Sequence, residues 1–99
     1  MKTRNKIIQQ RPNTSVSFFD ANQAFKDLKT TYVEENKLDD QGASWSDDQL
    51  IKTWTLVFPT NDDYLEFKSN SLCEDYIAGM SSYNTTNSIS YSIELDEIE

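Results

Sequence analysis

Adjacent acidic residues are the side chains of this 99-residue sequence whose type and spacing first suggest chemistry. The pairs are Glu34/Glu35, Asp39/Asp40, Asp47/Asp48 and Asp62/Asp63. Neighbouring carboxylates resemble metal ligands, but adjacent side chains point in different directions along a strand or a helix. None of the pairs has the ligand spacing of an EF-hand loop. We therefore interpret them as solvated turns and helix starts, and we predict no metal site.

Nucleophilic and phosphate-binding motifs are also missing. The sequence has no histidine, which excludes histidine-ligated metals and haems and any Ser-His or Cys-His nucleophile pair. Cys73 is the only cysteine, and without a base beside it we interpret it as a small core residue on a helix. Gly42 and Gly79 are the only glycines, too few for a phosphate-binding loop. We predict no catalytic residue and no cofactor.

The stretch Leu50–Phe58 predicts the strand around which the fold is organised. With a period of two, its apolar face carries Leu50, Trp54, Leu56 and Phe58, and only Lys52 interrupts that face. The other face carries Ile51, Thr53, Thr55 and Val57. Either tryptophan could stack on a planar ligand, but the strand pattern makes Trp54 a core residue and leaves only Trp45, near the hairpin, open to that role.

The remaining patterns predict three more strands and two helices. The predicted strands are Thr14–Phe19, Ala43–Ser46, Leu50–Phe58 and Ser88–Leu95. The residues before the second and the last of these strands, Asp39–Gly42 and Ser81–Asn87, are predicted to form a turn and a polar loop. The helices begin at the caps Asp20 and Thr60 and run to about Glu35 and Met80, the second with a break at Ser69–Ser71. This order predicts an α+β, ferredoxin-like β-α-β-β-α-β fold, a four-stranded antiparallel sheet with two helices on one face. The face under the helices should carry Val16, Phe18, Trp54, Leu56, Phe58, Ile89, Tyr91 and Ile93.

Charge divides the sequence into a basic start and an acidic body. Residues 1–11 carry four basic side chains and no acid, whereas residues 12–99 carry five lysines and seventeen acids, which gives the net charge of −8. We predict a basic extended arm at 1–13, a single domain at 14–95 and an acidic tail at 96–99. The acidic body should not bind nucleic acid. No apolar run could span a membrane or act as a signal peptide, so we expect a soluble, cytoplasmic protein.

The open face of the predicted sheet and the basic arm are the predicted interaction surfaces. Small uncharged residues on an exposed sheet face favour pairing with another protein or a second copy, since monomers place charges there. An extended basic arm can add to a sheet edge. The predicted interaction residues are Lys2, Arg4, Lys6, Arg11, Thr53, Thr55, Val57, Ser90 and Ser92.

The order of elements includes a broken second helix that reads Tyr64–Phe67 and then Tyr76–Met80 before an alternating last strand. Over residues 14–95, this pattern resembles the antibiotic-biosynthesis-monooxygenase-like group of dimeric α+β barrels. The resemblance implies that two copies pair through their open sheet faces and that the protein oxidises a small aromatic or degrades haem. Haem degradation in that group relies on a histidine, which this sequence lacks, so no catalytic residue is carried over. The composition also looks like that of small marine tailed-phage proteins.

Three functions are compatible with these patterns. We favour a non-enzymatic accessory or structural protein that docks on a protein partner or forms a homodimer; its composition favours a phage origin and therefore action in the host cytoplasm. The first alternative is a small dimeric-barrel oxygenase or ligand-binding protein, which needs a pocket between helices and sheet, and polar residues for such a pocket are lacking in the predicted elements. The second alternative is an acidic inhibitor that imitates nucleic acid, which needs its acids clustered on one surface.

Overall fold

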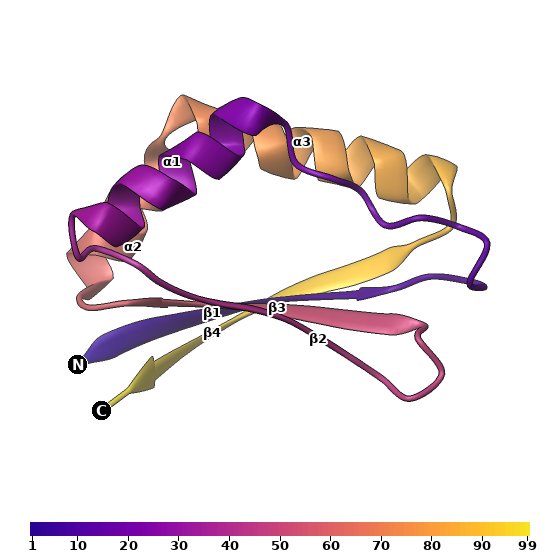
Figure 1. The fold of residues 1–99 in the computed structure, drawn as a ribbon, viewed down its shortest axis with the longest axis horizontal. Coiled ribbons are helices and arrows are strands. Elements are labelled where there is room, and N and C mark those ends of the chain that lie inside the picture. Colours follow the sequence, from indigo (N-terminus) through magenta and orange to yellow (C-terminus); the bar gives the residue numbers. More distant parts are fainter.

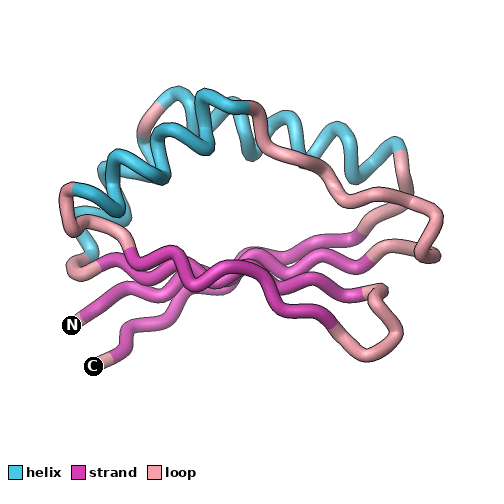
Figure 2. The backbone as a smooth tube through the Cα atoms, in the orientation of Figure 1, coloured by secondary structure: helices cyan, strands magenta, loops and turns pink.

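A computed structural model describes all 99 residues and shows an antiparallel sheet of four strands covered on one face by three helices (Figures 1 and 2). The strands are β1 (Lys2–Gln10), β2 (Asp39–Trp45), β3 (Ile51–Phe58) and β4 (Ser90–Ile98). The helices are α1 (Gln23–Glu34), α2 (Asn61–Ser69) and α3 (Ser71–Thr86). The strand order β2-β3-β1-β4 and the sequence of elements confirm the predicted ferredoxin-like fold.

Residues 2–10 form an interior strand, which corrects the prediction of an extended arm at 1–13. β1 lies between β3 and β4 and is antiparallel to both. The residues on its buried side are Thr3, Asn5, Ile7 and Gln9. Because three of these four are polar, the buried side lacks the apolar alternation by which a strand is recognised in sequence.

The segment 14–19, predicted as the first strand, instead connects β1 to α1 without pairing in the sheet. The Tyr83 hydroxyl on α3 donates a hydrogen bond to the Ser17 carbonyl at 2.6 Å. Phe19 packs against α3 where Gly79 leaves room, since a Cβ at that glycine would lie 3.1 Å from Phe19 Cζ. The alternation in this segment therefore does not indicate a strand. Phe19, for example, contacts the helix layer instead of the sheet.

β3 confirms the central strand predicted from Leu50–Phe58. Trp54, Leu56 and Phe58 face the helices, because they pair with the buried side of β1, and Thr53 and Thr55 face the opposite side. The predicted faces of this strand are therefore correct.

β2 begins earlier than the predicted strand Ala43–Ser46. Residues 39–42, expected to form a turn, continue the strand through a bulge between Asp40 and Gly42. Gly42 has a φ of 78°, a left-handed conformation that glycine adopts at little cost, so the glycine that suggested a turn instead accommodates the bulge.

The first two helices begin at side-chain caps. Asn22, rather than the predicted Asp20, caps α1 by accepting a hydrogen bond from the Phe25 backbone N–H at 2.9 Å. Thr60 caps α2 as predicted, and its hydroxyl oxygen accepts from the Asp63 N–H at 3.1 Å. Each cap satisfies one of the N–H groups that a helix start leaves without a partner.

The predicted break in the second helical region falls at Asn70, which ends α2 and caps α3. α3 then continues to Thr86, so the predicted polar loop at 81–87 is mostly helical. Met80 and Asn84, four residues apart on one helix face, are 0% and 1% exposed. The helix was predicted too short because the residue that continues its buried face is an asparagine.

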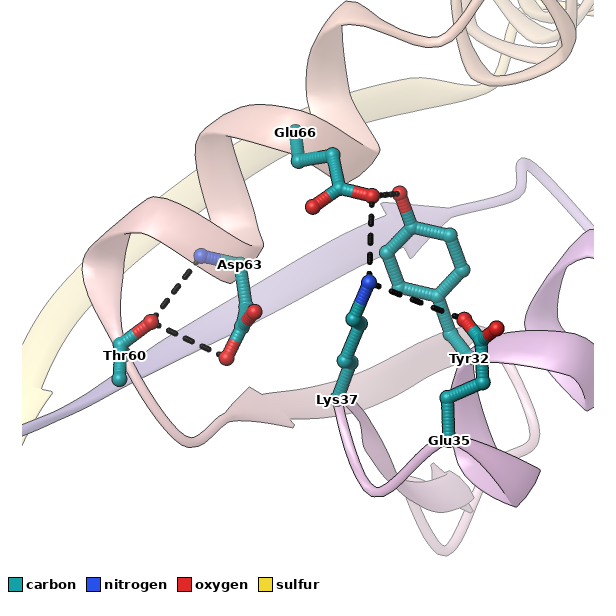
Figure 3. Close-up of polar contacts among 6 residues, drawn as sticks. All are labelled: Tyr32, Glu35, Lys37, Thr60, Asp63 and Glu66. Carbon is teal, nitrogen blue, oxygen red and sulfur yellow. Dashed lines mark hydrogen bonds and ion pairs between the residues drawn. The ribbon is translucent and has the colours of Figure 1, made fainter.

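Polar side chains join the end of α1 to α2 (Figure 3). The Tyr32 hydroxyl donates to the Glu66 carboxylate at 2.9 Å, and the Lys37 ammonium lies 3.5 Å from the same carboxylate and 3.8 Å from that of Glu35. Burial, the hydrogen bond to Glu66 and its negative charge raise the pKa of Tyr32 to about 12. The hydroxyl therefore remains a donor at physiological pH.

β4 is an edge strand that starts two residues later than predicted and includes most of the segment 96–99, predicted as a tail. Tyr91, Ile93 and Leu95 lie on its helix-facing side but are 38%, 43% and 50% exposed. Tyr91 and Ile93 are therefore not core residues as predicted, because the helix layer leaves this edge of the sheet uncovered. No helix of the structure combines the length and the apolar character needed to cross a bilayer.

Candidate functional site

A cavity of about 560 Å³ lies between the helix layer and the sheet. Its floor comes from β1, β3 and β2, and its roof comes from α1, α3 and the connection that precedes α1. Phe25 and Tyr76 stack in its wall with ring centroids 4.2 Å apart, and Phe19 lies 5.7 Å from Tyr76. Ligand cavities for small molecules have volumes of roughly 300–1,000 Å³ and mostly apolar walls. This cavity therefore has the size and lining of a small-molecule site.

A second, smaller cavity of about 170 Å³ shares Ile7, Phe25, Leu56 and Tyr76 with the first, so the two cavities adjoin beneath the helices. Cys73 lies in its wall and is 8% exposed. Burial, with a smaller effect of Glu74, raises the pKa of the Cys73 thiol to about 11, so almost no thiolate is present at neutral pH. The prediction that Cys73 is a core residue is confirmed.

A polar network enters the large cavity from β2 and α1. The Trp54 indole N–H donates to Asp40 Oδ1 at 2.7 Å, and Lys29 Nζ lies 3.3 Å from Asp40 Oδ2. The same ammonium lies 4.0 Å from the centroid of the Trp54 ring, a cation–π distance. The charge of Lys29 is thus compensated within the protein. Trp54 was predicted to be a core residue, and it does pack against the core, but it also lines the cavity.

Lys52 is the cation of the cavity without a carboxylate partner. None of the ion pairs in the structure includes it, and its Nζ lies 5.2 Å from the ring centroid of Trp54. Burial lowers the pKa of the Lys52 ammonium, the charge of Asp20 opposes this shift, and that of Lys29 adds to it. A half-buried ammonium without an ion-pair partner favours an anionic group nearby.

Two further aromatic rings lie beside Lys52. Phe18 and Trp45 meet edge to face with centroids 5.5 Å apart, and the Lys52 ammonium lies 5.7 Å and 5.6 Å from them. Trp45 is 45% exposed, so its ring can also contact a solvent-borne ligand. Arg11 lies 4.8 Å from Phe18, and its guanidinium donates to the carbonyl of Gln49 at 2.9 Å.

The structure gathers most of the predicted interaction residues on the open face of the sheet, away from the cavity. Strand registers place on this face Lys2, Arg4, Lys6, Thr53, Thr55, Val57, Ser90 and Ser92. Arg11, the ninth predicted residue, follows β1, and its guanidinium lies instead over the rings of Phe18 and Trp45. The face was expected to be mostly uncharged, but it carries charged residues, among them Arg4 and Asp96, which form an ion pair at 2.9 Å.

The polar residues of the cavity were missed by sequence reasoning. Lys29, Asp40 and Gln9 come from three separate elements and converge only through the fold. Lys52 could have been identified from the sequence, since it is the one charged residue on the apolar face of the central strand. The expectation that a pocket between helices and sheet would lack polar residues is therefore wrong.

Comparisons with known proteins identify the fold. No protein-family model and no curated protein matches the sequence. A structure from Caulobacter crescentus, described as that of a candidate antibiotic biosynthesis monooxygenase, is 12% identical, with a TM-score of 0.56 over 98% of this chain and 91% of that one. The structure of Rv0793 from Mycobacterium tuberculosis is 11% identical, with a TM-score of 0.53 over 98% of this chain and 95% of that one.

These likenesses correct the favoured functional prediction. The fold is shared with a structure described as that of a candidate monooxygenase, and this finding goes against the prediction of a non-enzymatic accessory or structural protein of phage origin. The alternative of a small dimeric-barrel oxygenase or ligand-binding protein agrees better with the comparisons. The resemblance to the antibiotic-biosynthesis-monooxygenase-like group is confirmed at the level of the fold.

Proposed function

We propose that the protein binds a small planar aromatic anion in the cavity between helices and sheet, as an oxygenase or ligand-binding protein of the dimeric-barrel kind. The observation that carries this proposal is the ammonium of Lys52, which has no ion-pair partner and lies on the floor of an aromatic cavity. The aromatic walls supply contact area for a flat ring system. The ammonium selects a ligand that carries an acidic oxygen.

The lowered pKa of Lys52 adds a chemical capability. A lysine with a lowered pKa has a larger fraction of neutral amine at neutral pH, and that amine can take a proton from an acidic hydroxyl of the ligand. The resulting ammonium then stabilises the oxyanion it has generated. An electron-rich aromatic oxyanion is the kind of ligand that a monooxygenase, the activity named for the similar structure, would oxidise.

Lys52→Met should weaken the binding of 2-naphthoate by roughly 10- to 100-fold, because a hydrogen bond to a charged group contributes more than one between neutral groups. Isothermal titration calorimetry measures the dissociation constant. Lys2→Met on the open face changes net charge equally and is the matched control. Equal losses in both variants, or no binding by the wild type, would contradict a site at Lys52. Oxygen consumption with a hydroxynaphthalene that binds then separates an oxygenase from a binding protein.

We also propose that the open sheet face pairs two copies of the chain. Small residues dominate the centre of this face. Arg4 and Lys6 lie opposite Asp96 and Glu94, which largely neutralise them, and Lys2 at the end of β1 lies opposite Ile98. An antiparallel sheet with one face on a core leaves the other free for an interface.

Thr55→Lys places an unpaired charge beside Lys6 at the centre of that face and should convert the dimer into a monomer. Sedimentation velocity at micromolar concentrations measures the change, with Ser82→Lys on the exposed surface of α3 as the control. A wild type that sediments as a monomer at high micromolar concentration contradicts the proposal.

A further inference from the structure

Two residues that carry hydrogen-bond donors are neighbours on the floor of the cavity. Lys52 on β3 and Gln9 on β1 are direct cross-strand partners, and both line the cavity. Side chains that pair in this way have Cβ atoms about 4.5–5.5 Å apart. The ammonium group can only donate hydrogen bonds, and the side-chain amide of glutamine donates through its nitrogen. The pair can therefore bind two oxygen atoms that lie next to each other.

Asn84 holds the Gln9 amide in one orientation. The Asn84 Nδ2 group donates to Gln9 Oε1 at 3.1 Å, and the two residues are 1% and 3% exposed. This bond occupies the oxygen of Gln9 and leaves its Nε2 group without a protein partner in the structure. Asn84 Oδ1 is the one buried side-chain polar atom without a hydrogen-bond partner. The Nε2 group of Gln9 is not among the buried unpaired atoms, and Gln9 lines the cavity, so this donor is available to a ligand there.

We infer that Lys52 and Gln9 together recognise two neighbouring oxygen atoms that share one negative charge on the aromatic ligand, with Asn84 as the positioning residue for Gln9. The inference rests on the proposed binding function and adds the substrate class. Such a group is either a carboxylate or a phenolate beside a carbonyl. In both, one oxygen meets the ammonium and the other meets the Gln9 Nε2–H. A ligand with a single oxygen leaves Gln9 unpaired.

The test compares three naphthalene ligands by calorimetry with the wild type and Gln9→Met, which keeps the length of the side chain and removes its donor. 2-Naphthoate represents the carboxylate, 1-acetyl-2-naphthol represents the phenol beside a carbonyl, and 2-naphthol has one oxygen. We expect Gln9→Met to bind one or both of the two-oxygen ligands about tenfold or more weakly. The binding of 2-naphthol should change less than threefold. The ligand that loses affinity identifies the group that is recognised.

The outcomes separate this inference from the proposed function. An equal loss for all three ligands means that Gln9→Met disturbs the cavity and overturns the role of Gln9 as a selective donor. Unchanged affinities overturn that role while leaving the binding function intact. A wild type that binds none of the ligands overturns the proposed function and the inference with it. Asn84→Leu should reproduce the selective loss, since it releases the amide of Gln9 without touching the ligand.

Discussion

A chain that lacks residues 1–11 should fail to fold. β1 is the only strand that pairs with β4 and also pairs along its length with β3, so its removal leaves β4 with no partner and divides the sheet. It also removes Ile7 from the core. Circular dichroism and the dispersion of amide resonances should show a largely unfolded chain. This expectation reverses the one drawn from sequence, in which these residues formed a dispensable arm.

Two controls make this deletion informative. Removal of the last three residues shortens only the edge strand and should leave a folded protein. A synthetic peptide of residues 1–11, added to the deleted chain, should restore folding by filling the vacant strand position. Cooperative melting of the deleted chain near the wild-type temperature would show that β1 is not required.

Phe58→Ala should lower the free energy of unfolding by about 3–5 kcal/mol, as for other large-to-small changes in cores. Phe58 is 0% exposed, and its ring lies 5.4 Å from those of Tyr64 and Phe67. Since a domain has a total stability of only about 5–15 kcal/mol, this loss should lower the urea midpoint strongly. Tyr91→Ala, at a 38% exposed aromatic, should cost far less. Similar losses in the two variants would mean that the β3 register is assigned incorrectly.

The part of the fold that was predictable from sequence is the part whose buried residues are apolar. β3 carries the large apolar residues Trp54, Leu56 and Phe58 at alternate positions, and the cap at Thr60 and the break at Asn70 are local signals that tertiary contacts did not alter. β1 and the end of α3 were missed because they bury Gln9 and Asn84, which bond to each other across the core. Taken alone, a glutamine or an asparagine predicts a solvent-exposed position, and only the tertiary structure brings the two amides together.

The candidate site was predictable to a smaller extent. Lys52 stood out as a charge on an apolar strand face, and Trp45 was identified as a possible stacking residue. The neighbours that give Lys52 a role, Gln9 and Asp40, depend on the strand register and on the bulge in β2. Register is normally indicated by the hydrophobic pattern of a strand, and the buried side of β1 is mostly polar, so its sequence does not show which residues it pairs with. The site could therefore be identified only from the three-dimensional arrangement of the strands.

The placement of β1 has a consequence for how the chain folds as it is synthesised. β1 is made first and its neighbour β4 last, and the outermost pair joins Lys2 to Ile98. Such non-local pairing slows folding, so β1 remains unpaired until the other strands have left the ribosome. Unpaired apolar strands tend to associate with other chains. The polar Thr3, Asn5 and Gln9 interrupt the buried side of β1 and so lower the tendency of the unpaired strand to aggregate.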